Sequence, residues 1–286
     1  MGLRRYFKEL KKKKKGFKQV QVGNYQLTAD NQHLIEDYLT NHKYYSRNLP
    51  RIAKYLESKY PVYAIVDVGA NIGDTIALLR SEGVNQMVYL IEGEHTYFDL
   101  LQKNLKQFTN FISIHSFLGE NNDIAAGFVD AKDGTAKIKL EAGKQTTIRQ
   151  LDTVATDYAF KTIKLLKTDT DGFDFKVIRG SYALINKDKP VLFFEYVAAF
   201  INELDPDGNR TLKELQQIGY DKALFYDNYG KLLISTELRN TQQLQQLFIY
   251  MDNGDGAFPY YDVCVFHKDD DALADEIIAL EMAYYK

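Results

Sequence analysis

The chain has 286 residues, of which 45% are hydrophobic and 26% charged, so it can fold around a sizeable core and is too apolar for a disordered protein. Its net charge is −3, and its single cysteine, Cys264, excludes an internal disulfide framework and any zinc site built from several thiolates. No apolar run approaches the roughly 20 residues that cross a bilayer, and no signal peptide is apparent. We therefore expect a cytoplasmic protein in which Cys264 is a core residue.

Positive charge is concentrated in a basic tail at the N-terminus. Residues 1–18 contain nine Lys/Arg and one acid, which leaves 27 Lys/Arg against 38 Asp/Glu in the remainder. The acidic remainder argues against a nucleic-acid partner, because binding along phosphates needs clustered basic residues on the folded domain. Leu3, Phe7 and Leu10 recur at helical spacing in the tail. The tail is therefore either a solvated segment or a peripheral contact with the inner membrane face.

Residues 19–60 are predicted to form an N-terminal helical region. Leu34, Ile35, Tyr38 and Leu39 share one face of a helix, and a second apolar stripe follows Pro50. The region is expected to end before residue 61, where the pattern changes.

Strands and helices alternate over residues 61–286. Apolar runs predict strands near residues 62–68, 87–91, 111–114, 163–166, 191–194, 223–226 and 263–266. A β-hairpin insertion near residues 119–150, with its turn at Lys132-Asp-Gly134, interrupts the alternation. The pattern predicts an α/β fold that is Rossmann-like and doubly wound, with a mostly parallel seven-stranded sheet and an antiparallel last strand. Such folds bind ligands at the carboxyl ends of their strands.

A glycine-containing segment, Val66-Asp-Val-Gly-Ala-Asn-Ile-Gly-Asp74, lies between a predicted strand and a predicted helix. Gly69 and Gly73 permit a tight turn, and the helix N-terminus offers unpaired N–H groups. Asn71 stands where a dinucleotide-binding fingerprint has glycine, so the cradle for a pyrophosphate is incomplete. Asp67, at the end of the strand, is expected to direct a negative charge at the ligand, which disfavours phosphates and favours a cation.

Glu92 closes the next predicted strand, where an acid accepts hydrogen bonds from both ribose hydroxyls. A nucleoside with a cationic tail and no phosphate describes S-adenosylmethionine (SAM). Two alternatives stay open. One is a nicotinamide-dependent enzyme on a similar fold, and the other is a non-catalytic binding module that keeps the SAM pocket.

Three further acids stand at the carboxyl ends of later strands. Asp169 and Asp171 share one face of an extended chain, and Glu195 ends the following strand. Neighbouring carboxylates raise one another's pKa, so one of the three is expected to serve as a general base toward an acceptor hydroxyl. Alternatively the three acids bind Mg²⁺ or Ca²⁺, or Lys167 balances their charge.

Several motifs occur in one order along the chain, from Ile65 to Glu195. They are the glycine-containing segment, Leu90-Ile-Glu92, Lys103-Asn-Leu105, Thr147-Ile-Arg-Gln-Leu-Asp152, Leu166-Lys-Thr-Asp-Thr-Asp-Gly-Phe-Asp174, Val177-Ile-Arg-Gly180 and Lys189-Pro-Val-Leu-Phe-Phe-Glu195. In this set and order the chain resembles the FkbM-type methyltransferases, SAM-dependent enzymes that mostly O-methylate sugars and related natural products. Two departures are Glu92-Gly93, where the family usually has Glu-Pro, and Asp171, where it has Glu.

The resemblance implies a set of site residues and a substrate class. The residues implied to hold SAM are Asp67, Gly69, Ala70, Asn71, Gly73 and Glu92, with Ser116 and Phe117 bordering the adenine. The acceptor implied is a sugar hydroxyl, in a surface glycan or a glycosylated metabolite. Asp169, Asp171 and Glu195 are then the candidates that remove its proton.

Overall fold

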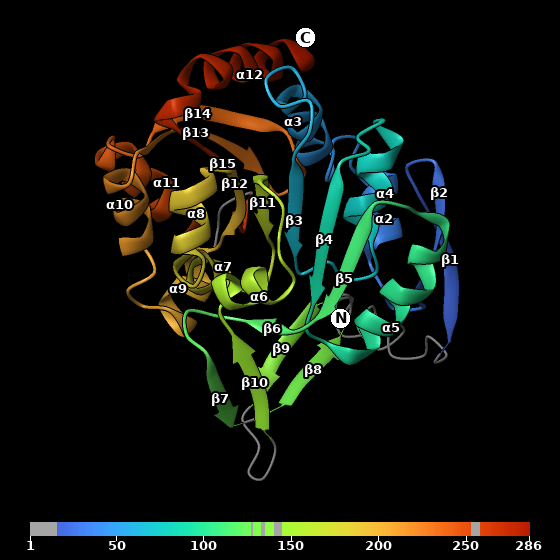
Figure 1. Ribbon diagram of the computed structural model, residues 1–286. Coiled ribbons are helices and arrows are strands. Elements are labelled where there is room, and N and C mark those ends of the chain that lie inside the picture. Colours follow the sequence, from blue (N-terminus) through green and yellow to red (C-terminus); the bar gives the residue numbers. More distant parts are fainter. Residues whose placement is uncertain (1–15, 127, 133–134, 140–144, 253–257) are drawn as a thin grey trace, which may run out of the picture.

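The computed structural model describes residues 16–126, 128–132, 135–139, 145–252 and 258–286 (Figure 1). The predicted helical spacing at Leu3, Phe7 and Leu10 lies outside the described residues, and so do residues 133 and 134 of the predicted hairpin turn. The membrane contact expected of the basic tail therefore stays a prediction.

The central layer is an eight-stranded sheet with the spatial order β14-β13-β15-β12-β11-β3-β4-β5 (Figure 1). From β5 to β12 neighbouring strands are parallel, whereas β15 pairs antiparallel with both β12 and β13. This arrangement confirms the α/β prediction of a mostly parallel sheet with an antiparallel last strand. The strands are β3 (Ala64–Val68), β4 (Met87–Glu92), β5 (Phe111–His115), β11 (Ile163–Thr168), β12 (Val191–Tyr196), β13 (Tyr220–Asp227), β14 (Leu232–Glu237) and β15 (Tyr261–His267).

The predicted count of seven strands is wrong, because the connection between β13 and β15 contains an additional strand and a helix. β14 pairs antiparallel with β13 at the edge of the sheet, and α11 (Thr241–Asp252) follows it. None of the six side chains of β14 is fully buried. An edge strand of this kind lacks the long apolar run by which a strand buried on both faces is recognised.

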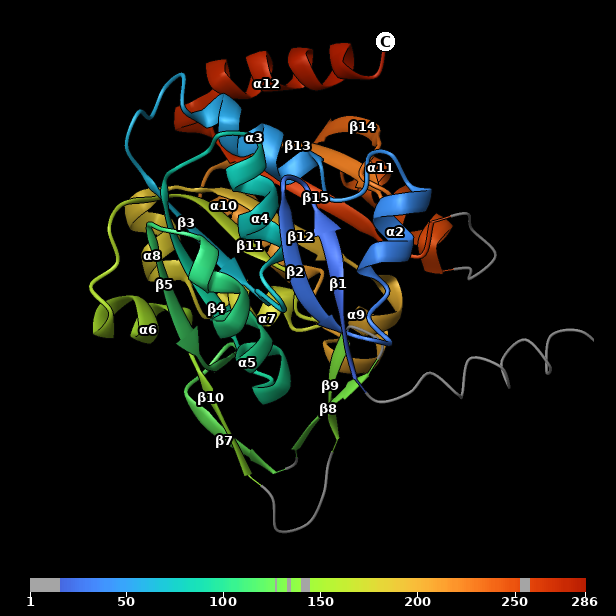
Figure 2. The same cartoon turned by 90° about the vertical axis from the view of Figure 1, so that its right-hand side faces the viewer.

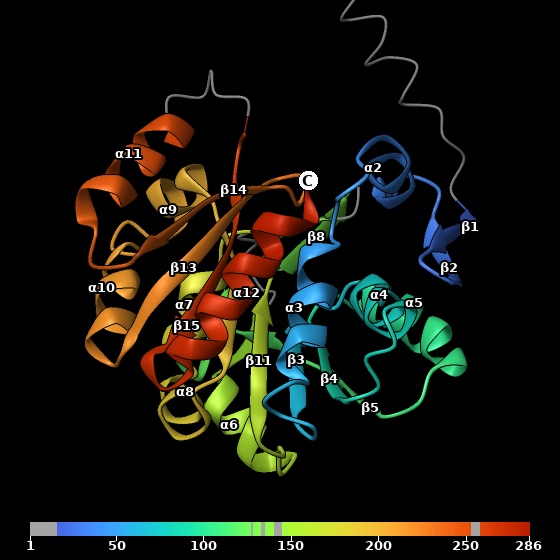
Figure 3. The same cartoon turned by 90° about the horizontal axis from the view of Figure 1, so that it is seen from above.

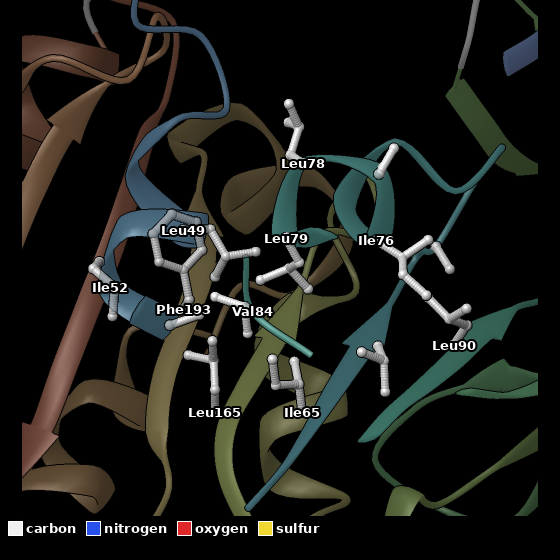
Figure 4. Close-up of a cluster of buried hydrophobic side chains, with 14 of the residues drawn as sticks. Leu49, Ile52, Ile65, Ile76, Leu78, Leu79, Val84, Leu90, Leu165 and Phe193 are labelled. Carbon is white, nitrogen blue, oxygen red and sulfur yellow. The ribbon is translucent and has the colours of Figure 1, made fainter. Parts of the chain in front are cut away.

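Helices cover both faces of the sheet, as Figure 3 shows. One layer packs into a core with Leu90 and Leu165, and Figure 4 shows Phe193 beside Leu49 of α3 in this core. The first layer consists of α3 (Asn48–Leu56), α4 (Asp74–Ser81), α5 (His95–Asn104) and α12 (Asp271–Tyr284), and the second contains α6 (Leu151–Asp157), α7 (Asp174–Arg179), α8 (Tyr182–Asp188), α9 (Ala198–Leu204), α10 (Arg210–Gln217) and α11.

In the part of the chain that the structure describes, no helix combines the length and the hydrophobicity of a membrane-spanning segment.

The N-terminal region begins with a β-hairpin and is not wholly helical as predicted. β1 (Phe17–Val22) and β2 (Tyr25–Asp30) pair antiparallel and pack against α4 and α5 (Figure 2). Val20 and Val22 are buried while their neighbours are not, which is the period of two that a strand requires. The helical stripe after residue 34 does form α2 (Ile35–Asn41).

Two small sheets lie where the insertion was predicted. β8 (Phe128–Lys132) and β9 (Thr135–Lys139) form an antiparallel pair. A second sheet has the order β6-β10-β7, with β6 (Phe117–Leu118), β7 (Asp123–Ala126) and β10 (Gln145–Arg149). β6 follows β5 directly, so this sheet begins at the carboxyl edge of the main one.

The strand order reverses between β3 and β11. The chain passes from β3 to β4 and β5 on one side, and later adds β11 and β12 on the other side. Folds of this type bind ligands in the crevice outside the carboxyl ends of the strands at such a point. Cys264 lies in β15, away from this edge, and is fully buried as predicted.

Candidate cofactor and acceptor site

A cavity of about 570 Å³ opens at the carboxyl ends of β3, β4, β11 and β12. Its volume is in the range of small-molecule binding sites. The structure thus brings together loops that are far apart in the sequence. Eight of the eleven predicted site residues line it, namely Gly69, Asn71, Glu92, Ser116, Phe117, Asp169, Asp171 and Glu195.

The other three predicted residues lie behind the cavity wall. Asp67 is fully buried, and its Oδ1 accepts a 2.9 Å hydrogen bond from Lys167 Nζ while its Oδ2 has no partner. Burial raises the pKa of Asp67 to about 6, although Lys167 acts in the opposite direction. Ala70 is buried in the core, and Gly73 is the N-cap of α4 with φ +89°. The expectation that Asp67 directs its charge at the ligand is therefore corrected, because its carboxyl faces Lys167.

Gly69 is required by the close approach of two loops. Its φ is +79°, and a Cβ at this position would lie 1.8 Å from the carbonyl oxygen of Asp169. The Asp169 N–H in turn donates a 3.0 Å hydrogen bond to the Val68 carbonyl. Only glycine leaves room for this crossing, which places Asp169 beside the loop after β3.

Glu92 lies at the end of β4 with its carboxylate held by backbone amides. Oε2 accepts a 2.8 Å hydrogen bond from Asn71 N, and Oε1 accepts a 2.7 Å hydrogen bond from Glu94 N. Burial raises the pKa of Glu92 to about 7, while these backbone donors act to lower it. A carboxylate has about four acceptor positions, so Glu92 can accept further donors from the cavity.

Phe117 occupies the space above Gly93. A Cβ on Gly93 would lie 2.1 Å from the Phe117 ring, so glycine at this position makes room for the aromatic side chain. Ser116 N donates a 3.0 Å hydrogen bond to the Glu92 carbonyl. An aromatic side chain and a short polar one therefore border the cavity next to Glu92.

The three predicted acids Asp169, Asp171 and Glu195 line one cavity, together with Lys167. Lys167 Nζ lies 3.4 Å from Asp169 Oδ2, and the Asp169 side chain is 48% exposed. Burial, followed by the charges of Asp169 and Asp174, raises the pKa of Glu195 well above its ordinary value. The same cavity thus contains an accessible acid beside a cation, and a second acid whose pKa burial raises.

The divalent cation predicted as an alternative does not fit this arrangement. Within the described ranges, no three His, Cys, Asp or Glu side chains are placed to hold a metal ion. Lys167, the other predicted alternative, supplies the countercharge to Asp169.

Sequence reasoning missed several polar or aromatic residues of the cavity wall, among them His33, Asp74 and Tyr260. Asp74 and Tyr260 also border a recess of about 70 Å³ beside the main cavity, together with Asp262. Asp74 closes the glycine-containing segment and could have been found there. His33 and Tyr260 come from segments outside every motif, so only the fold reveals them.

Comparison with known proteins gives one family match. The Methyltransferase FkbM domain matches residues 67–222, slightly more than half of the chain. No curated protein sequence matched the chain.

Several solved structures match the chain. Methyltransferase FkbM from Methylobacillus flagellatus KT is 20% identical with a TM-score of 0.38, over 57% of this chain and 41% of that one. M. jannaschii TYW2, in complex with AdoMet, is 11% identical with a TM-score of 0.38, over 89% and 88%. A putative O-methyltransferase from Klebsiella pneumoniae is 10% identical with a TM-score of 0.42, over 77% and 80%.

Proposed function

Because this chain belongs to the FkbM methyltransferase family, we propose that it is a SAM-dependent O-methyltransferase that acts on a sugar hydroxyl. The observation that carries the proposal is that Glu92 and Asp169 line the same cavity at the reversal of strand order. Glu92 suits the hydroxyls of a ribose, and Asp169 suits an acceptor hydroxyl. The acceptor is a surface glycan or a glycosylated metabolite, as the resemblance in sequence implies.

The residues of the cavity fit SAM. Bound there, SAM supplies an electrophilic methyl group on a positively charged sulfur. Glu92 accepts hydrogen bonds from the ribose hydroxyls while its backbone partners keep the carboxylate in place. Ser116 and Phe117 border the adenine.

Asp169 and Glu195 have different environments and therefore different roles in the proposal. Asp169, half exposed and 3.4 Å from Lys167, accepts the hydroxyl proton as the acceptor oxygen bonds to the methyl carbon and the carbon–sulfur bond breaks. Glu195, whose pKa is raised by burial, retains its proton and donates a hydrogen bond to the acceptor. The products are a methyl ether and S-adenosylhomocysteine. Holding oxygen, carbon and sulfur in line provides much of the acceleration.

Transfer of a labelled methyl group tests the proposal. The full chain is incubated with methyl-labelled SAM and a panel of mono- and oligosaccharides, each paired with an analogue that lacks one hydroxyl. We expect label in a carbohydrate as a methyl ether, lost when the relevant hydroxyl is absent. Label on nitrogen or on a non-carbohydrate acceptor would contradict the assigned substrate. S-adenosylhomocysteine binding without transfer to any acceptor would favour a binding module.

A further inference from the structure

His33, from the N-terminal region, reaches the loop that follows β3. Its Nε2 lies 3.0 Å from Asn71 Oδ1, and its Nδ1 accepts a 3.2 Å hydrogen bond from Ile35 N. Because Nδ1 is an acceptor, Nε2 carries the proton and donates to the Asn71 side chain. His33 is 7% exposed, and its hydrogen bond to Asn71 is part-buried.

Asn71 is held from two sides. Its φ of +47° lies in the left-handed region, which asparagine adopts more readily than most residues. Its backbone N–H donates to Glu92 Oε2 at 2.8 Å, and its side chain accepts from His33. The conformation of Asn71 therefore connects His33 to the carboxylate that we assign to the ribose.

A second contact, which is buried, ties the hairpin to the same loop. Asn104 Oδ1 accepts from Thr28 N at 2.8 Å, and Asn104 Nδ2 donates to the carbonyls of Thr28 and Ile72 at 3.0 and 2.9 Å. Thr28 and His33 both precede the family match at residues 67–222. The hairpin and the turn after it are therefore fixed to the loop of residues 69–73 through two independent polar contacts.

We propose that His33 is a positioning residue of the cofactor site, which acts by holding Asn71 and, through it, the Glu92 carboxylate. The N-terminal region is then a structural part of the site, although it lies outside the family match. The identity of the ligand in this inference rests on the proposed function.

Two substitutions separate the two hydrogen bonds of His33. His33→Gln places an N–H donor near the position of Nε2 and keeps the bond to Asn71, whereas His33→Asn is too short for that bond but retains an acceptor for Ile35 N. We expect His33→Asn to weaken S-adenosylhomocysteine binding about tenfold in calorimetry, which corresponds to one hydrogen bond, and His33→Gln to remain near wild type. Equal weakening by both variants, or by neither, would overturn the proposal.

Amide hydrogen exchange of the ligand-free chain tests the same inference without the cofactor. His33→Asn should increase exchange over residues 69–73 and leave β4 unchanged, and His33→Gln should restore protection. In an Asn71→Gly background, His33→Asn should have no further effect, because the bond is already absent. Unchanged exchange in His33→Asn would refute the role of His33. If wild type binds no S-adenosylhomocysteine, the proposed function fails, and exchange alone decides whether His33 positions the loop.

Discussion

Lys167 and Asp67 are register partners on the neighbouring strands β11 and β3, and Lys167 Nζ lies 2.9 Å from Asp67 Oδ1. The same ammonium lies 3.4 Å from Asp169, which lines the cavity. Burial favours the neutral lysine, but the surrounding carboxylates outweigh it and raise the pKa of Lys167 well above its ordinary value. A buried ion pair at the reversal of strand order thus orients the acid that we assign as the general base.

Breaking this pair from either side should destabilise the fold. Asp67→Asn leaves Lys167 without its buried counterion, and Lys167→Met leaves Asp67 without its cation. Lys167→Met should lower the free energy of unfolding in urea by about 3–5 kcal/mol, because an uncompensated charge remains buried. Asp67→Asn should lower it by less, because Asp169 remains 3.4 Å from Lys167. The double variant should lose less free energy of unfolding than the two single variants lose together. Strict additivity would show that the two groups do not depend on each other.

Gly69→Ala should damage both the fold and the cofactor site, because the new methyl group meets the Asp169 carbonyl oxygen. Gly83→Ala is the matched control, since Gly83 has a similar φ of +77° but no atom within 4 Å of the added Cβ. We expect about 1–2 kcal/mol of destabilisation for Gly83→Ala from its backbone conformation alone, with S-adenosylhomocysteine binding retained. Gly69→Ala should lower the free energy of unfolding by more than Gly83→Ala does, and it should abolish S-adenosylhomocysteine binding. Similar behaviour of the two variants would contradict the close approach of the loops.

The two acids of the acceptor site should respond differently to isosteric substitution. Asp169→Asn removes the proposed base and should lower kcat by about 10²–10⁴-fold with little change in cofactor affinity. Glu195→Gln retains a hydrogen-bond donor and should lower kcat less than about tenfold. Steady-state transfer of labelled methyl measures both. A larger loss for Glu195→Gln would reverse the assignment of the base.

The buried acids predict how stability depends on pH. The pKa of Glu92 is raised to about 7 in the folded state from 4.5, so between these values the folded chain binds more protons than the unfolded chain. The free energy of unfolding of the ligand-free protein should therefore fall as pH rises from 4.5 to 7, by up to about 1.4 kcal/mol per pH unit from this group. Glu92→Gln should reduce the slope, as urea titrations at several pH values would show. An unchanged slope would argue against the raised pKa.

Prediction from sequence succeeded where one local pattern decides the structure. β3 was recognisable because all five of its residues are buried, and Glu92 because the end of a buried strand marks the edge where ligands bind. β14 was not recognisable from the sequence, because an edge strand exposes its side chains. The partner of Asp67 lies 100 residues away, and only the parallel register of β3 and β11 brings Lys167 to it.

The remaining site residues depend on tertiary contacts that no local pattern shows. His33 reaches Asn71 because the hairpin packs on α4 and α5, and Tyr260 lines the cavity because β15 lies next to β12. Neither residue belongs to a motif. Their chemistry became interpretable only when the strand order was known.

Calorimetric titration with S-adenosylhomocysteine tests the central claim most directly, comparing wild type with Glu92→Ala and Glu94→Ala. Glu94 is a suitable control because its carboxylate accepts from Tyr97 N at 2.8 Å as the N-cap of α5, and it is absent from the wall of the main cavity. We predict micromolar binding by wild type and by Glu94→Ala, and its loss in Glu92→Ala. Absence of binding by folded, ligand-free wild type, or equal affinity in Glu92→Ala, would contradict the account.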